Sequence, residues 1–250
     1  MLAFFCERTA ACAERPFMSK SSREATKSTA GAFLRMARAE LLQFFTRQFE
    51  KRHVISVKNK LELLITKILA RVEEKQAERE DFPLILAIDG KSGSGKTTLA
   101  ALLSEKTGAL VLHMDDFFLR PEQRTDKRLK EIGGNVDYER FSAVLSQVKA
   151  KEEVQYQPYD CKTGTLQEIQ IFKPEKIVIV EGSYSMNSYF GDYADIKVGM
   201  DIDAERQKER ILKRNGQMML ARFLEEWIPK ENVYLEEFKI FEKCDFRISV

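Results

Sequence analysis

Short apolar runs alternate with amphipathic stretches over much of this chain. The runs with the length and composition of buried strands cover residues 82–88, 110–113, 176–180, 196–200 and 246–250. The stretches between them carry apolar residues at helical spacing, clearest in residues 137–148, 204–226 and 229–242. Strands that alternate with helices predict an α/β fold, here an open five-stranded, mostly parallel sheet flanked by helices.

Three segments depart from this alternation. Residues 154–172 alternate polar and apolar positions on both sides of a turn that contains Gly164, which predicts a small β-hairpin projecting from the sheet. Residues 1–35 have no sustained period and predict a flexible or marginally helical leader. Residues 36–80 repeat apolar positions at helical spacing, so we expect a helical extension that docks on a domain formed by residues 81–250.

A glycine-rich segment follows the first apolar run directly. Residues 90–97 read Gly-Lys-Ser-Gly-Ser-Gly-Lys-Thr and match the phosphate-binding P-loop pattern G-x-x-x-x-G-K-[ST], with a strand before it and a helix after it. The glycines allow consecutive N–H groups to converge on one anion at the positive end of the helix. We therefore expect a nucleotide polyphosphate here, with Lys96 along the β- and γ-phosphates and the Thr97 hydroxyl on Mg²⁺. The expected nucleotide-binding residues in this segment are Gly90, Ser92, Gly93, Ser94, Gly95, Lys96, Thr97 and Thr98.

Acidic residues stand at the ends of two other predicted strands. Asp115 and Asp116 follow residues 110–113, and Glu181 follows residues 176–180. The carboxyl ends of parallel strands share one edge of a sheet, which is where ligands bind. An Asp across from the phosphate site could position an acceptor hydroxyl and take its proton, and Glu181 suits an outer-shell magnesium ligand. The alternatives are an acidic turn that caps a loop and a simple carboxylate at a strand end.

A series of motifs resembles the uridine kinase and phosphoribulokinase family of P-loop kinases over residues 82–250. The resemblance rests on residues 90–98, 113–118, 135–141, 157–160 and 180–182, and on residues 201–204, which lead into an arginine-bearing helix. It implies that Asp115 is the catalytic base and that Glu181 serves the metal. The P-loop pattern already gives Lys96 its catalytic role at the phosphates and Thr97 its role as a metal ligand. The resemblance implies a substrate site formed by Asp116, Phe118, Asp137 and Tyr159, in which Asp137 binds ribose hydroxyls and Tyr159 lines the nucleoside pocket. It also implies phosphate contacts from Arg210 and Arg214. An alternative for these arginines is that they only pair with nearby glutamates on a solvated helix.

Two departures from the family pattern affect the expected substrate. Nucleoside-specific members usually carry a Phe and a His after the hairpin Tyr-Asp, whereas this chain has Cys161 and Gly164 at those places. The Arg-Gly-Arg element common in the lid of the family is replaced by residues 213–219. Uridine as the substrate, and the usual lid chemistry, are therefore both in question.

Composition excludes several other classes of protein. The hydrophobic fraction of 44% is sufficient for a sizeable core, and the formal net charge is only +2. The basic residues of the leader do not interleave with aromatic ones, so we expect no nucleic-acid partner and no membrane partner. Four scattered cysteines without a C-x-x-C pair argue against a zinc site and a disulfide framework, and for a cytoplasmic location.

The sequence thus predicts an ATP- and Mg²⁺-dependent kinase that phosphorylates a small hydroxyl-bearing substrate, with a nucleoside favoured. Another alcohol, such as pantothenate or a sugar phosphate, is an alternative acceptor for the same machinery. A nucleotide-binding regulatory module with little catalysis is an alternative from another class. A GTPase is disfavoured because no N-K-x-D segment occurs in the chain. A homo-oligomer is compatible with the sequence.

Overall fold

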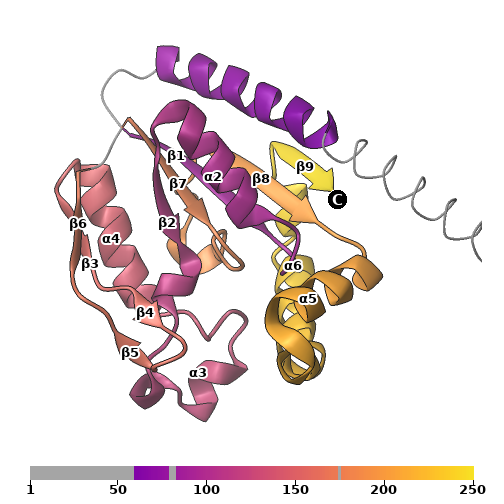
Figure 1. Ribbon diagram of the computed structural model, residues 1–250. Helices are drawn as coiled ribbons and strands as arrows, with labels where there is room; N and C mark the ends of the chain where they lie inside the picture. The colour runs from indigo at the N-terminus through magenta and orange to yellow at the C-terminus, as the bar shows by residue number, and fades with distance from the viewer. Residues whose placement is uncertain (1–58, 79–82, 174–175) are drawn as a thin grey trace, which may run out of the picture. The chain divides into compact units, whose positions relative to one another are not determined.

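The computed structural model describes residues 59–78, 83–173 and 176–250, which belong to one compact unit, Val57–Val250. Its centre is a parallel sheet with the strand order β2-β7-β1-β8-β9 (Figure 1). The strands are β1 (Leu84–Gly90), β2 (Leu110–His113), β7 (Ile177–Glu181), β8 (Ile196–Asp201) and β9 (Phe246–Ser249). The predicted five-stranded α/β fold is therefore confirmed. The predicted leader, residues 1–35, and much of the predicted extension lie outside the described residues.

The register of the sheet brings three predicted site segments to one edge. Glu181, the last residue of β7, lies opposite Ile88 of β1 and opposite His113 of β2. Because all these strands are parallel, the loops that follow them leave from the same side. The P-loop after β1, the acidic segment after β2 and Glu181 are thereby neighbours.

Alternation along β1 divides the core between the two faces of the sheet. Ile85 and Ala87 belong to one apolar cluster and Leu84, Leu86 and Ile88 to another, and every residue of β1 is buried. The main helices are α2 (Lys96–Thr107), α4 (Tyr138–Ala150), α5 (Ala204–Arg222) and α6 (Ile228–Glu237). Residues of α4 and α6 pack in the first cluster, and residues of α2 pack in the second.

A further helix covers residues 59–78 and is drawn in indigo in Figure 1. Its apolar side chains Leu64, Ile65, Ile68 and Val72 belong to the same cluster as α2. Helical spacing in the sequence therefore predicted both this helix and its buried face.

An aspartate caps the start of each of two helices. Asp137 accepts a hydrogen bond from the backbone N–H of Arg140 at the start of α4, and Asp203 does the same for Arg206 at the start of α5. Helix α5 is interrupted at Gly216, which has φ 79° and ψ 173°. A π-helical turn, Phe223–Trp227, then joins α5 to α6.

The predicted hairpin consists of two short antiparallel ladders. Strand β3 (Val154–Tyr156) pairs with β6 (Gln170–Phe172), and β4 (Tyr159–Asp160) pairs with β5 (Thr165–Leu166). Helix α3 (Asp126–Lys130) comes before α4 in the chain and is not part of the hairpin. Within the described ranges, no helix has the length and apolarity needed to cross a membrane.

Candidate active site

The P-loop forms a tight turn between β1 and α2. Gly90, Gly93 and Gly95 have φ angles of 133°, 76° and 100°, a region that residues with a side chain rarely adopt. A Cβ on Gly90 would lie 1.9 Å from the carbonyl oxygen of Met200. The glycine at this position is therefore required by both its backbone angle and the close approach of β8.

Lys96 lies across this turn. Its ammonium group donates to the carbonyl oxygens of Gly90 at 2.8 Å and Lys91 at 3.0 Å, and to the Ser183 hydroxyl at 3.3 Å. The side chain is buried, so its position is fixed by these contacts. The charge is thereby held at the first turn of α2, where a helix N-terminus already favours anions.

Oxygen atoms of Thr97 and Glu181 meet beside the loop. The Thr97 hydroxyl donates to Glu181 Oε1 at 3.1 Å, and His113 Nδ1 lies 2.6 Å from the same oxygen. The hydrogen bond to Glu181 raises the pKa of His113. A hydroxyl and a carboxylate are hard ligands that fit Mg²⁺, an ion that usually keeps several waters and takes few protein ligands. In the described part of the chain no group of three or more His, Cys, Asp or Glu residues could hold a metal.

Asp115 and Asp116 form the start of a short 3-10 helix, Met114–Phe117, directly after β2. Asp115 keeps solvent-exposed surface, although many protein atoms surround its carboxyl group. Desolvation by those atoms and the charge of Glu181 raise the pKa of Asp115, whereas the charges of Lys96 and Arg214 lower it. Asp115 is therefore within electrostatic range of the P-loop residue Lys96, of the candidate metal ligand Glu181 and of Arg214 in the lid helix.

Asp116 faces the hairpin instead. Its carboxylate accepts a hydrogen bond from the Tyr156 hydroxyl at 3.1 Å, and burial raises its pKa. The two adjacent acids thus have different surroundings, and among the described residues only Asp116 of the pair has a side-chain hydrogen bond to the protein. This difference supports Asp115 over Asp116 for contact with an acceptor hydroxyl.

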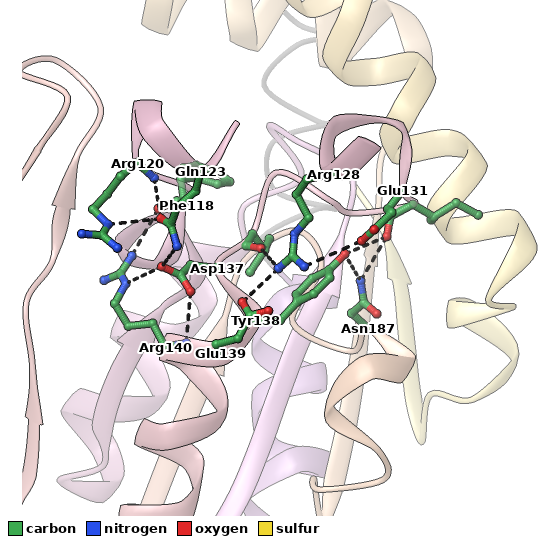
Figure 2. Close-up of polar contacts among 12 residues, drawn as sticks. Phe118, Arg120, Gln123, Arg128, Glu131, Asp137, Tyr138, Glu139, Arg140 and Asn187 are labelled. Carbon is green, nitrogen blue, oxygen red and sulfur yellow. Dashed lines mark hydrogen bonds and ion pairs between the residues drawn. The ribbon is translucent and has the colours of Figure 1, made fainter. Parts of the chain in front are cut away.

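Asp137 lies beside Gln123, Phe118 and Arg140 in one of the groups of polar contacts in Figure 2. It is 3% exposed, and it accepts hydrogen bonds from the backbone N–H of Arg140, from Arg140 Nε at 3.3 Å and from Gln123 Nε2 at 3.1 Å. Arg140 also donates to the carbonyl oxygen of Phe118 at 3.2 Å. The carboxylate of Asp137 is thus engaged in capping α4 and joining it to the segment after β2. Its expected contact with ribose hydroxyls stays a prediction, and it requires a substrate to compete with Gln123.

Tyr159 of the hairpin is held by Arg124. Arg124 Nη2 donates to the Tyr159 hydroxyl at 2.8 Å, and Arg124 Nε donates to the Leu119 carbonyl oxygen at 3.1 Å. Arg124 is an exposed residue, whereas Tyr159 is buried. Burial and the charge of Asp115 raise the pKa of the neighbouring Cys161, and the charge of Arg124 lowers it. The hairpin turn therefore lies near both Asp115 and Arg124.

Of the two lid arginines, Arg210 reaches the P-loop from α5, whereas Arg214 donates to the Asn215 side chain. Arg210 Nη1 donates to the carbonyl oxygen of Gly93 at 2.9 Å, and the charge of Arg214 acts on Asp115. Arg206 instead pairs with Asp203 at 3.3 Å. The alternative that these arginines only pair with glutamates on a solvated helix is therefore wrong for Arg210.

Sequence reasoning missed two buried acids that hold the P-loop. Asp89 accepts hydrogen bonds from the backbone N–H groups of Gly90 and Met186 and from the Tyr234 hydroxyl, and burial raises its pKa. Glu231 of α6 accepts a hydrogen bond from the backbone N–H of Ser92. No sequence signal marks Glu231, because it is one Glu among several on a helix 139 positions from its partner.

Comparisons with known proteins agree with this architecture. A solved structure described as a possible uridine kinase from Bacillus stearothermophilus has a TM-score of 0.56 at 23% identity, over 77% of this chain and 99% of that chain. That likeness concerns the fold. Curated uridine kinases from Leuconostoc citreum and Chlamydia pneumoniae are 28% and 30% identical to this chain. Those matches cover 53% and 52% of this chain, and 69% and 62% of the two relatives.

The model of the phosphoribulokinase / uridine kinase family matches residues 85–218, which is more than half of the chain. The matched segment contains the P-loop, the acids after β2 and β7, the hairpin and the lid arginines. This chain therefore belongs to the phosphoribulokinase / uridine kinase family.

Proposed function

We propose that this protein is a kinase that transfers the γ-phosphoryl group of ATP to a hydroxyl group of a small molecule. The observation that carries the proposal is the placement of Asp115. Asp115 is an exposed residue within electrostatic range of Lys96, Arg214 and Glu181, at the sheet edge from which the P-loop leaves. A phosphoryl transfer site needs an acid near the acceptor hydroxyl and cations near the transferred group, and these residues supply both.

The nucleotide phosphates are assigned to the P-loop. The backbone N–H groups of residues 93–97 would bind them, together with Lys96 and with Arg210 and Arg214 of the lid. The Ser94 hydroxyl is buried and has no hydrogen-bond partner in the described protein, which leaves it able to meet a ligand. Ser92 differs, because both its N–H and its hydroxyl are bonded to Glu231. Its contribution is therefore to the shape of the loop.

Thr97 and Glu181 would hold the Mg²⁺ ion that accompanies ATP. Bound there, the ion would neutralise charge on the phosphates. Asp115 would orient the acceptor hydroxyl and accept its proton, and Lys96 would stabilise the charge of the transferred group.

A nucleoside is the first candidate for the acceptor. The relatives named above are uridine kinases, and the family resemblance assigns the substrate site to Asp116, Phe118, Asp137 and Tyr159. Ribose hydroxyls suit carboxylate partners, and an aromatic side chain suits a base.

A second candidate is an alcohol with an anionic group, such as pantothenate or a sugar phosphate. The favouring observation is Arg124, an exposed residue whose guanidinium group lies beside Tyr159 and near Cys161. A guanidinium group at this place would bind a carboxylate or phosphate of the substrate. Cys161 and Gly164, at the places of the pyrimidine-recognising Phe and His, fit this candidate as well.

Matched acceptors separate these candidates. Purified protein with Mg-ATP would be assayed with uridine, with pantothenate against uncharged pantothenol, and with ribulose 5-phosphate against ribulose. Arg124→Gln should raise KM about tenfold for an anionic acceptor and leave uridine turnover within about twofold. Lys127→Gln, an exposed change in α3, is the control. Efficient phosphorylation of uridine alone would reject the second candidate, and tight ATP binding without any ADP formed would favour a regulatory module over both.

A further inference from the structure

Glu231 is a buried carboxylate that the proposed reaction does not use directly. It lies in α6 and is 2% exposed. Its two oxygens accept hydrogen bonds from the Ser92 N–H at 2.8 and 2.9 Å, the Ser92 hydroxyl at 2.8 Å, the Ser183 hydroxyl at 2.7 Å and Gln207 Nε2 at 3.2 Å. A buried carboxylate is costly unless several donors satisfy it. These donors come from the P-loop, from the turn after β7 and from the lid helix α5.

Ser183 connects Glu231 to the P-loop lysine. Its hydroxyl has one proton and two acceptors within reach, Glu231 Oε1 at 2.7 Å and the Gly90 carbonyl oxygen at 3.3 Å. The shorter contact, to a charged acceptor, takes the proton. A lone pair of the Ser183 oxygen then accepts from the Lys96 ammonium at 3.3 Å. The result is a chain of two hydrogen bonds from Lys96 through Ser183 to Glu231.

Helix α6 does not need these two hydrogen bonds in order to pack against the sheet. One turn after Glu231, Tyr234 is fully buried and donates to Asp89 at the end of β1. Leu235 of the same helix packs in the apolar cluster. Helix α6 is therefore attached to the sheet independently of Glu231.

We infer that Glu231 is a positioning residue, which fixes Lys96 through Ser183 and fixes the P-loop through Ser92. The inference rests on the proposed function, because it concerns how Lys96 meets the phosphates of ATP. A charged acceptor polarises the Ser183 hydroxyl and makes its oxygen a better acceptor for the ammonium group. Gln207 adds a link to α5, because it bonds both Glu231 and the carbonyl oxygen of Ser92.

The inference is tested by the affinity for Mg-ATP, measured calorimetrically with the full chain in the variants Glu231→Gln and Ser183→Ala. Each should weaken binding about tenfold or more, because Lys96 loses its fixed position. The double variant should bind Mg-ATP no more than about twofold more weakly than the single variant with the lower affinity, because both changes break the same pair of hydrogen bonds.

Ser185→Ala is the matched control. Ser185 lies two positions from Ser183 in the same turn, and its buried hydroxyl donates to the Ile88 carbonyl oxygen at 3.2 Å rather than toward Lys96. Its Mg-ATP affinity should stay within about twofold of wild type, and its Tm should fall at least as far as that of Ser183→Ala. A structural role alone would move Tm and affinity together in both serine variants.

The outcomes distinguish this inference from the proposed function. Three outcomes would overturn the positioning role of Glu231 and leave the proposed function standing. They are an unchanged Mg-ATP affinity in Ser183→Ala, an equal loss of affinity in Ser185→Ala, and additive losses of affinity in the double variant. If Glu231→Gln does not fold, Ser183→Ala and its control decide. Wild-type protein that binds no Mg-ATP would contradict the proposed function, and the inference with it.

Discussion

At the scale of single residues, the surroundings of Asp115 distinguish it from the other acids of the site. Glu181 is committed to Thr97 and His113, Asp116 to Tyr156, and Asp137 to Arg140 and Gln123. Asp115 is an exposed residue, and the charges of Lys96 and Arg214 act to lower its pKa. Its carboxylate is thus the one of these four whose hydrogen bonds are not taken up by another side chain of the described residues.

Replacement of Asp115 by Asn should therefore separate binding from turnover. The amide has nearly the same shape but cannot take a proton, so we expect kcat to fall about a hundredfold or more. The affinity for Mg-ATP should change little, because the P-loop contacts stay in place. Initial rates and calorimetry measure the two quantities, and Asp126→Asn on exposed α3 is the control. Normal turnover of Asp115→Asn would remove Asp115 from the role of base.

The raised pKa of Asp115 predicts the acidic limb of the pH profile. Desolvation and the Glu181 charge raise its pKa above the ordinary value of 3.8. The charged form is the base, so kcat should fall as the pH decreases through this raised pKa. Steady-state rates against pH locate the limb. If the residual activity of Asp115→Asn falls by the same factor over the same pH range, the acidic limb belongs to another group.

At the scale of elements, the sequence predicted best what depends on neighbouring residues. The strand, glycine loop and helix around residues 84–107 follow one another in the chain, and caps such as Asp137 act within three residues. The order of strands in the sheet and the buried contacts of Glu231 depend on segments far apart in sequence. Local spacing contains no information on those contacts, so they became visible only in the fold.

Gly90 tests the close contact between the P-loop and β8. Gly90→Ala would place a methyl group 1.9 Å from the Met200 carbonyl oxygen at φ 133°, so we expect a loss of unfolding free energy of about 3 kcal/mol or more. Gly108→Ala is the control, since its φ is 71° and nothing lies within 4 Å of the added Cβ. That change should cost about 1 kcal/mol. Chemical denaturation measures both, and equal losses would contradict the steric account.

At the scale of the whole described unit, two apolar clusters pack on opposite faces of the sheet. They fix the carboxyl ends of the strands, where the candidate active site lies. The apolar periodicity of the sequence identified most of their members, including the buried face of the helix of residues 59–78. It did not distinguish a separate extension from a part of the core, because the same spacing fits both. The structure places Ile68, which is fully buried, in the cluster that also contains Leu86 and Leu99.

Truncation of Ile68 should accordingly destabilise the catalytic unit. Ile68→Ala should lower the free energy of unfolding by about 2 to 5 kcal/mol, because it leaves a cavity in the core. Leu63→Ala lies on the same helix at a side chain that is 56% exposed, and it should cost well under 1 kcal/mol. Urea unfolding compares the two variants. Equal stability of Ile68→Ala and Leu63→Ala would show that this helix contributes no core packing.

The most direct test of the account is to identify the product of the reaction. Wild-type protein, Asp115→Asn and Lys96→Ala would each be incubated with Mg-ATP and a mixed library of nucleosides, sugars and hydroxy acids, and the products identified by mass spectrometry. The account predicts one phosphorylated alcohol and stoichiometric ADP with wild type, and severe loss of both with either variant. No phosphorylated acceptor from wild type, or undiminished product from Asp115→Asn, would contradict it.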